Sequence, residues 1–483
     1  MANSLDVTRV ARRRDQLTPV FEATDTGVRT WSPARLIRGV PPRDSDGVAA
    51  RLGEQFLNLN HRSLALLGAE ARLIHSGRAV EISVHTSSSI GAIPLVSPVT
   101  GRPDLGLVVR PRFQWSGLGK VLAETGMQTI PALLPLPPLP HSDREIPPWV
   151  LSTVVLDRIG ALLGAMSRRF ETIEAELPAP RGSVDWQRWA TKSLPSARTI
   201  AVPCRYPELR VDTDMMGFIH HVLRLQRVSL EEQRSSAEIG RALLGVCESL
   251  LHIVERWPAR PAAPQVVSSW MRRPTLSQKL RDGLTAGLWT VEQRGLAGSS
   301  ELAGLPWRLD MEVVFENWLA AAMAGWAQRH GFTVRTGQRR QTTTPLYWDP
   351  PYSGSQKSLV PDLLLERSDL VLVVDAKYKS HWDELERAER WLAVDEDLRD
   401  AHREDLLQIL AYTTAQTASR VVGVLMYPCR ADTWERLLAR GQMLNRASVA
   451  SGSRRVDLIL AAVPFTAKRE DMNLLFDRLL EEF

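Results

Sequence analysis

Val360-Pro361-Asp362 and Asp375-Ala376-Lys377 stand at the two ends of one short hydrophobic hairpin, and this stretch decides the fold. The sequence between them is apolar on either side of a polar turn, Arg367–Asp369. This pattern predicts a strand, a tight turn and a second strand, at Leu359–Glu366 and Leu370–Val374.

The predicted hairpin gathers two carboxylates and a lysine at one end. Side chains alternate between faces along a strand, so Asp375 and Lys377 point the same way while Ala376 points into the packing. The pairing of the strands then places Asp362 beside them. Burying such charges costs free energy unless a bound ion balances them, and a divalent cation is the natural ion for two carboxylates. The two carboxylates and the Ala376 backbone carbonyl are hard oxygen ligands suited to Mg²⁺ or Mn²⁺.

Helices and strands that complete an α/β core flank the hairpin in both directions. A helix is expected upstream, because Phe315, Trp318 and Leu319 recur at helical spacing. The expected elements, in order, are the helix Met311–Trp326, the strand Phe332–Arg339, the hairpin itself, the helix Asp405–Gln416 and the strand Arg420–Tyr427.

The order helix, three strands, helix, strand resembles the core of the PD-(D/E)XK (restriction-endonuclease-like) nuclease superfamily. The resemblance implies phosphodiester hydrolysis, with Asp362, Asp375 and Lys377 as catalytic residues and Mg²⁺ or Mn²⁺ as the cofactor. Glu316 matches the place of an extra carboxylate in the helix before the core, where it would be catalytic or a metal ligand. The alternative for Glu316 is an exposed helix carboxylate paired with a neighbour.

Gln408 and Tyr412 resemble the QxxxY motif of the RecB-like branch of that superfamily. They are four residues apart and share one helix face, so they support either the active site or only the packing of the helix on the sheet. Lys379 lies on the same strand face as Lys377 and is the rival catalytic lysine. Contact with the DNA backbone is its expected role.

The composition indicates an intracellular protein of several domains. A chain of 483 residues is long enough for two to four of them. No apolar run reaches about 18 residues, and Met1–Asp15 has no hydrophobic signal core. The three cysteines, Cys204, Cys247 and Cys429, are far apart, which argues against a disulfide framework or a zinc site. We therefore expect a cytoplasmic protein with no membrane segment.

Four parts are expected along the chain. They are an N-terminal α+β module at 1–130 that docks a partner, a proline-rich linker at 131–148, a mainly helical middle domain at 149–300 and the nuclease domain at 301–483. The last carries 23 basic and 27 acidic residues, so the overall net charge of +5 leaves +9 for residues 1–300. Basic surface for a polyanion would thus come from the N-terminal part or from a partner.

The sequence before the core is less regular. Helices are expected at Ala49–Leu67, Trp115–Thr125, Val150–Ala175, Asp214–Trp257 and Leu276–Leu288, strands at Ala71–Ile74, Ala79–Val84 and Leu105–Val109, and an irregular segment at Pro178–Arg210. Ser116–Lys120 (SGLGK) lacks the first glycine and the hydroxyl residue of a phosphate-binding loop. NTPase activity within this chain is therefore not expected.

Several motifs resemble the McrC subunit of methylcytosine-specific, type IV restriction systems. They are Gly106–Gln114 (GLVVRPRFQ), Pro180–Asp185 (PRGSVD), Val211–Asp214 (VDTD), Asp375–Lys379 (DAKYK) and Asp405–Tyr412 (DLLQILAY). The resemblance implies an endonuclease that cuts double-stranded DNA and depends on a separate, ring-forming AAA+ NTPase (McrB-like) that selects the substrate. The N-terminal part would dock into that ring and stimulate its nucleotide hydrolysis.

Two other functions remain open from the sequence. One is a stand-alone repair or recombination nuclease of RecB-like type, acting on ends or single strands. The other is a degenerate nuclease fold kept as an adaptor of the motor, which the intact Asp362, Asp375 and Lys377 disfavour. A neighbouring gene for an AAA+ protein would favour the restriction system.

Overall fold

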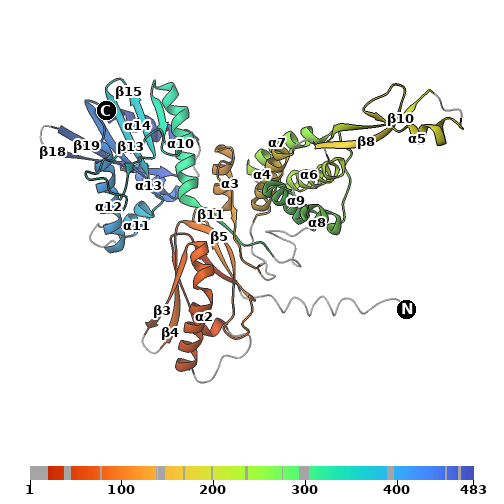
Figure 1. Cartoon of the computed structure of the whole chain (residues 1–483). Helices are drawn as coiled ribbons and strands as arrows, with labels where there is room; N and C mark the ends of the chain where they lie inside the picture. The colour runs from red at the N-terminus through yellow and green to blue at the C-terminus, as the bar shows by residue number, and fades with distance from the viewer. Residues whose placement is uncertain are drawn as a thin grey trace. The chain divides into compact units, whose positions relative to one another are not determined.

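The chain folds into two compact units, which are described separately. The first combines Met1–Val150, Ser236–Ala242 and Gly295–Phe483, and the second combines Leu151–Ser235 and Leu243–Arg294. The residues expected to form the N-terminal module and the nuclease domain thus share one unit, while the expected division into four parts stays a prediction. The computed structural model describes residues 20–36, 45–76, 79–137, 139, 147–166, 169–196, 200–210, 212–233, 238–274, 276–292, 304–388, 396–451, 454–465 and 469–482 (Figure 1).

Two sheets and a long helix make up the N-terminal part of the first unit. One sheet has the strand order β1-β6-β5-β11-β7 and the other β2-β4-β3. The elements are β1 (Val20–Thr24), β2 (Val28–Trp31), η1 (Pro33–Leu36), α2 (Ser45–Leu67), β3 (Ala69–Ser76), β4 (Ala79–Thr86), β5 (Ser89–Leu95), β6 (Leu105–Arg110), α3 (Gln114–Glu124), β7 (Ala132–Leu133) and β11 (Trp307–Asp310). The helices and strands predicted here are confirmed, whereas β1, β2, β5 and β11 were not predicted.

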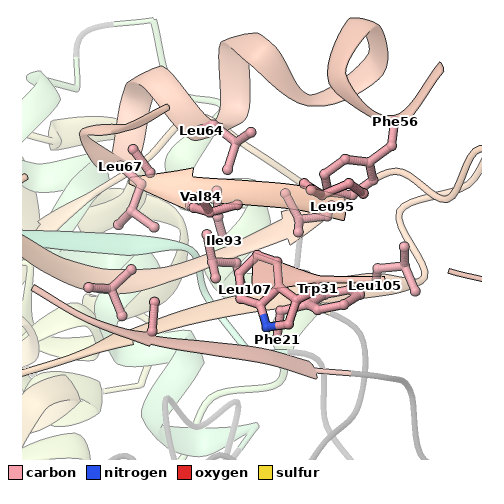
Figure 2. Close-up of a cluster of buried hydrophobic side chains, with 14 of the residues drawn as sticks. Phe21, Trp31, Phe56, Leu64, Leu67, Val84, Ile93, Leu95, Leu105 and Leu107 are labelled. Carbon is pink, nitrogen blue, oxygen red and sulfur yellow. The ribbon is translucent and has the colours of Figure 1, made fainter. Parts of the chain in front are cut away.

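The core of this part lies between α2 and the strands. Figure 2 shows Phe56, Leu64 and Leu67 of the helix directed toward side chains of the sheets. Phe21 packs against Trp31, with 4.9 Å between ring centroids. Burial of these large apolar side chains stabilises the module, at roughly 1.5–3 kcal/mol for each.

A six-stranded mixed sheet forms the C-terminal part of the first unit, in the order β12-β15-β16-β17-β19-β18. β16, β17 and β19 are parallel neighbours, and the other pairs are antiparallel. The elements are α10 (Met311–Arg329), β12 (Thr333–Thr336), β13 (Thr344–Pro345), β14 (Ser358–Leu359), β15 (Leu363–Arg367), β16 (Leu370–Ala376), α11 (His381–Ala388), α12 (Glu396–Thr414), β17 (Arg420–Cys429), α13 (Ala431–Ala439), β18 (Leu444–Ser451), β19 (Arg454–Pro464) and α14 (Arg469–Glu481).

The predicted hairpin is confirmed, and its register positions the candidate site. β15 and β16 pair antiparallel, with Leu363 opposite Val374. Asp362 immediately precedes β15 and Asp375 follows Val374, so the two carboxylates come to the same end of the hairpin. The predicted helices at Met311–Trp326 and Asp405–Gln416 are also confirmed, as α10 and α12, so the sequence order of the expected core is present.

The second unit combines helices with a three-stranded antiparallel sheet, in the order β8-β10-β9. Its elements are α4 (Trp149–Ala165), β8 (Arg169–Leu177), β9 (Ser183–Val184), α5 (Trp186–Arg188), η2 (Trp189–Ser193), β10 (Val202–Arg210), α6 (Thr213–Gln233), α7 (Glu238–Val254), α8 (Pro264–Met271) and α9 (Gln278–Val291), with the first residues of α4 and α7 in the first unit. The predicted helices at Asp214–Trp257 and Leu276–Leu288 correspond to α6, α7 and α9.

Two predictions for the second unit were wrong. The helix predicted at Val150–Ala175 ends at Ala165, and part of the segment predicted as irregular, Pro178–Arg210, forms β10. Ile173 and Ala175 of β8 stand opposite Tyr206 and Cys204 of β10. Their alternation with glutamates is a strand period, which the helix-favouring Glu and Ala residues masked.

The structure also bears on the SGLGK segment, the cysteines and membrane helices. Ser116–Lys120 lies inside helix α3, so it does not form a phosphate-binding loop. The three cysteines are free and buried. Within the part of the chain that the structure describes, no helix is long and apolar enough to cross a membrane.

Candidate active site

Asp362 and Asp375 form the centre of the candidate site. The backbone N–H of Ala376 donates a hydrogen bond of 2.7 Å to Asp362 Oδ2, which holds this carboxylate against the end of β16. Asp375 is only 1% exposed. Burial, with added repulsion from the Asp375 and Glu316 carboxylates, raises the pKa of Asp362 to about 8. Burial also raises the pKa of Asp375, against the opposing effect of Lys377.

Lys377 supplies the positive charge of the site and is held from two sides. Its Nζ lies 2.8 Å from Asp375 Oδ2 and donates a hydrogen bond of 2.8 Å to Gln408 Oε1. Gln408 Nε2 in turn donates to the Tyr412 hydroxyl, at 2.6 Å. Burial opposes the charged form of Lys377, yet the Asp375 carboxylate raises its pKa above the ordinary value. The two α12 residues predicted as supporting groups thus form a hydrogen-bonded chain to the lysine.

Glu316 reaches the same site from α10. Its carboxyl is close enough to Asp375 and Lys377 for their charges to act on it. Burial is the main cause that raises the pKa of Glu316. Within the described residues Glu316 is not grouped with Asp362 and Asp375 closely enough to form a three-carboxylate metal site, so its catalytic or metal-binding role stays a prediction.

Lys379 is engaged elsewhere. Its Nζ donates to both carboxylate oxygens of Asp405, at 2.7 and 2.8 Å, and to the Ala401 carbonyl at 3.1 Å. Tyr427 also donates to Asp405, at 2.9 Å. Because the Lys379 ammonium is already paired with Asp405, it is not available for the catalytic role proposed for Lys377. Its expected contact with the DNA backbone stays a prediction.

A buried ionic cluster joins the strand after Asp375 to the N-terminal part of the same unit. The Tyr378 hydroxyl donates to Asp25 Oδ2 at 2.6 Å, and the Arg112 backbone N–H donates to Asp25 Oδ1 at 2.6 Å. The Arg112 guanidinium lies over the Tyr378 ring, 4.5 Å from its centroid, and donates to Ser380. Burial raises the pKa of Asp25, and the Arg112 charge opposes this shift.

The donor set of the site fits a small divalent cation. Two adjacent buried carboxylates share a single lysine, so a second positive charge would relieve their repulsion. In the described ranges, no three His, Cys, Asp or Glu side chains are grouped closely enough to hold a metal ion. A metal here would therefore take Asp362, Asp375 and the Ala376 carbonyl as protein ligands. Mg²⁺ commonly binds through one or two carboxylates and keeps several waters, which suits this set.

Several functional contacts were missed at the level of sequence. Arg112 and Tyr378 were noticed as motif residues, but nothing in the local pattern indicated that they meet at Asp25. Gln338 and the exposed aromatic residues that follow it were not singled out at all. The signal that was available is the aromatic pair Tyr347-Trp348, with Tyr352 four residues later, in the segment that precedes Pro361.

Comparison with known proteins gives one family match. The family model described as McrBC 5-methylcytosine restriction system component matches residues 149–428. No curated protein matches the chain.

Two solved structures are similar at low scores. The first is a refined half-complex from a tetradecameric assembly of Thermococcus gammatolerans McrB AAA+ hexamers with bound McrC (13% identity, TM-score 0.42, 95% of this chain and 100% of that chain). The second is the cryo-EM structure of the Thermococcus gammatolerans McrBC complex (12% identity, TM-score 0.25, 64% of this chain and 88% of that chain). The assignment to a family therefore rests on the match to the family model.

Proposed function

Because the chain belongs to the family of McrBC 5-methylcytosine restriction system components, we propose that it is a Mg²⁺-dependent DNA endonuclease, the cutting subunit of such a system. The observation that carries this proposal is the constellation of Asp362, Asp375 and Lys377 at one end of the β15–β16 hairpin, in which Asp375 is buried and paired with Lys377. The sequence of α10, β12, β15, β16, α12 and β17 supports a PD-(D/E)XK nuclease core. The hydrogen bonds from Lys377 to Gln408 and from Gln408 to Tyr412 support it further.

Each residue has a role that follows from its contacts. The Lys377 ammonium has three N–H groups, and Asp375 and Gln408 engage two of them, which leaves one donor for a phosphate oxygen or the attacking water. Tyr412 fixes the orientation of the Gln408 amide. When bound to Asp362, Asp375 and the Ala376 carbonyl, Mg²⁺ would supply Lewis-acid activation of the water and the scissile phosphate.

Metal binding is expected to stabilise the protein more at pH 8 than at pH 6. The unfolded Asp362 carboxyl loses its proton near pH 4, but the folded one keeps it until about pH 8, so metal-free stability falls as the pH rises between these values. Mg²⁺ binds the deprotonated form and offsets this loss. At 10 to 100 times its dissociation constant it would add about 1–3 kcal/mol. Thermal unfolding in Mg²⁺ and in EDTA at both pH values measures the difference.

Asp362→Asn should lose most of the Mg²⁺ increment and flatten the pH dependence. Asp369→Asn, in the exposed turn of the same hairpin, should keep both. An increment of the same size at pH 6 and pH 8, or one that persists in Asp362→Asn, would contradict the assignment of the metal ligands.

The proposed partner is a separate AAA+ NTPase, and the second unit offers a surface for it. The segment between β8 and β10 exposes three large apolar side chains: Trp186 is 63% exposed, Leu194 50% and Ile200 87%. Exposed apolar groups gathered in one segment are typical of a protein interaction site. No phosphate-binding loop is found in the described ranges of this chain, so nucleotide hydrolysis is assigned to the partner.

The double variant Trp186→Ala/Leu194→Ala is expected to weaken association with the NTPase by about tenfold or more, since both side chains would lose buried area at an interface. Titration of the full-length protein with the NTPase measures this. Val449→Ala, an exposed apolar residue of β18, serves as the control. If the double variant associates with the NTPase as tightly as the wild type, Trp186 and Leu194 do not belong to the docking surface.

A plasmid cleavage assay with Mg²⁺, with and without the NTPase and on methylated and unmodified DNA, tests the function as a whole. Cutting that requires the NTPase supports the restriction subunit. NTPase-independent cutting would favour a stand-alone RecB-like nuclease, and absence of Mg²⁺-dependent cutting under all conditions would favour an inactive adaptor.

A further inference from the structure

The segment 338–357, here called the aromatic hairpin, lies between β12 and β14, shortly before Asp362 in the chain. β13 and β14 pair antiparallel at its base, with Thr344 opposite Leu359, and Leu346 N donates to the Lys357 carbonyl at 2.8 Å. Beyond this base it exposes Tyr347 by 91%, together with Trp348 and Tyr352. Aromatic side chains left this open to water are expected to have a binding role.

The exposed rings are held in place by contacts within the hairpin. Trp348 Nε1 donates a hydrogen bond of 2.9 Å to the Gln356 carbonyl. The Trp348 ring meets the Tyr352 ring edge to face, at 6.1 Å between centroids. Tyr347 is therefore presented beside an ordered aromatic pair. Little conformational freedom would be lost when a flat ligand packs there.

The base of the hairpin is bonded to the candidate active site itself. Gly337 N donates to the Asp362 carbonyl at 2.8 Å, and Thr342 Oγ1 donates to the Pro361 carbonyl at 2.6 Å. A ligand bound to the hairpin would thus lie on a segment whose base is hydrogen-bonded to Asp362, a proposed metal ligand. A β-carbon at Gly337 would come within 2.8 Å of the Pro361 carbonyl, so this close approach requires glycine.

The charge of the hairpin is opposite to that of the domain around it. Arg339, Arg340 and Lys357 are exposed and make no ion pair within the described residues, and Asp349 is the single acidic residue of the segment. Residues 301–483 as a whole carry an acidic excess. Exposed cations beside exposed aromatic rings are the combination that binds a nucleic acid strand, through its phosphates and its bases.

We propose that the aromatic hairpin binds the DNA strand beside the scissile phosphate, with Tyr347 and Trp348 stacked on an unpaired base and with Arg339 and Lys357 on the flanking phosphates. This inference rests on the proposed nuclease function and deepens it. The substrate at the moment of cutting then has at least one base out of the duplex, at an end, a flap or a locally opened site. A protein partner on the same rings is the competing occupant.

The test measures the affinity of the full-length protein for a fluorescein-labelled duplex with a single-stranded overhang, by anisotropy and without the NTPase. Ca²⁺ replaces Mg²⁺ so that binding is observed without cleavage. Tyr347→Ala should bind about tenfold more weakly, and Tyr347→Phe should bind like the wild type because it keeps the ring. The loss should be smaller on a blunt duplex, which offers fewer unpaired bases.

A second variant tests the charges. Arg339→Ala should reduce the slope of log affinity against log salt by about one, as expected for one lost phosphate contact. Arg339 is preferred to Arg340 because Arg340 has φ 55° and its replacement would disturb the turn. Val28→Ala removes an exposed apolar side chain, 56% exposed, that lies outside both the hairpin and the proposed NTPase surface, and it should bind like the wild type.

The outcomes separate the two proposals. Wild-type affinity of Tyr347→Ala, or an equal loss in Val28→Ala, overturns the hairpin inference even where Asp375-dependent cleavage is intact. Undiminished DNA binding with weakened NTPase association also overturns it, in favour of the protein partner. Absence of DNA binding by the wild type overturns the hairpin inference alone, because the cleavage assay with the NTPase tests the nuclease, whereas absence of cleavage with Tyr347-dependent binding overturns the nuclease alone.

Discussion

Asp375→Asn is expected to lower the rate of DNA cleavage by about 10³-fold or more. A neutral amide cannot supply the anionic ligand that a cation needs, and it no longer pairs with the Lys377 ammonium at 2.8 Å. Lys377→Gln should produce a similar loss, because Lys379 is held by Asp405 and is not free to replace it. Single-turnover cleavage of plasmid DNA with Mg²⁺ and the NTPase measures both effects.

The same substitution should leave the fold intact. Burial raises the pKa of Asp375, so its charged form costs stability in the metal-free protein, and a neutral side chain of the same shape removes that cost. The melting temperature in EDTA is therefore expected to stay the same or to rise. Asp369→Asn, on the same hairpin, is the matched control for cleavage. Wild-type cutting by Asp375→Asn would end the active-site assignment.

The second large effect is expected at Arg112. Its side chain and that of Asp25 are 4% and 0% exposed, so Arg112→Met leaves a buried carboxylate without its countercharge. Breaking a buried pair from one side costs about 3–5 kcal/mol. Denaturant unfolding followed by circular dichroism measures this loss for the first unit.

The pH dependence of this loss has a definite sign. Burial already raises the pKa of Asp25, and without the Arg112 charge this pKa would rise further. The penalty applies only to the charged carboxylate, so the destabilisation of Arg112→Met should shrink as the pH falls and Asp25 takes up its proton. The double variant Asp25→Asn/Arg112→Met is the control, since it buries no unpaired charge and should recover much of the stability. Equal stability of wild type and Arg112→Met at neutral pH would show that the pair contributes nothing.

The local pattern was sufficient for the core around the candidate site. The alternation that put Asp375 and Lys377 on one face, the helical spacing in α10 and the i, i+4 pair in α12 all describe neighbours within a few residues. The contacts of Lys377 with Asp375 and Gln408 follow from those patterns once the hairpin and the parallel strand β17 are in place. These elements were predictable because propensity, period and burial agree there.

The misses have two physical causes. Long-range pairing leaves no local signature: β1 pairs with β6 and β5 with β11, across separations that no periodicity records. In β8, helix-favouring side chains occupy a strand, and the long antiparallel pairing with β10 outweighs their local preference. The meeting of Arg112 and Tyr378 is a contact of the first kind, so it too was not predictable.

The position of β11 in the chain has a consequence for synthesis. This strand lies between β5 and β7 in the N-terminal sheet, yet it is translated about 170 residues after the remainder of that sheet. At about 5–20 residues per second, a nascent chain waits on the order of ten to thirty seconds with the edge of β5 open. The second unit is complete on the ribosome within this interval and can fold first. Slower translation would lengthen the exposure of this edge, whereas chaperone binding to residues 89–133 would protect it. Both therefore affect the fraction of newly made protein that folds instead of aggregating.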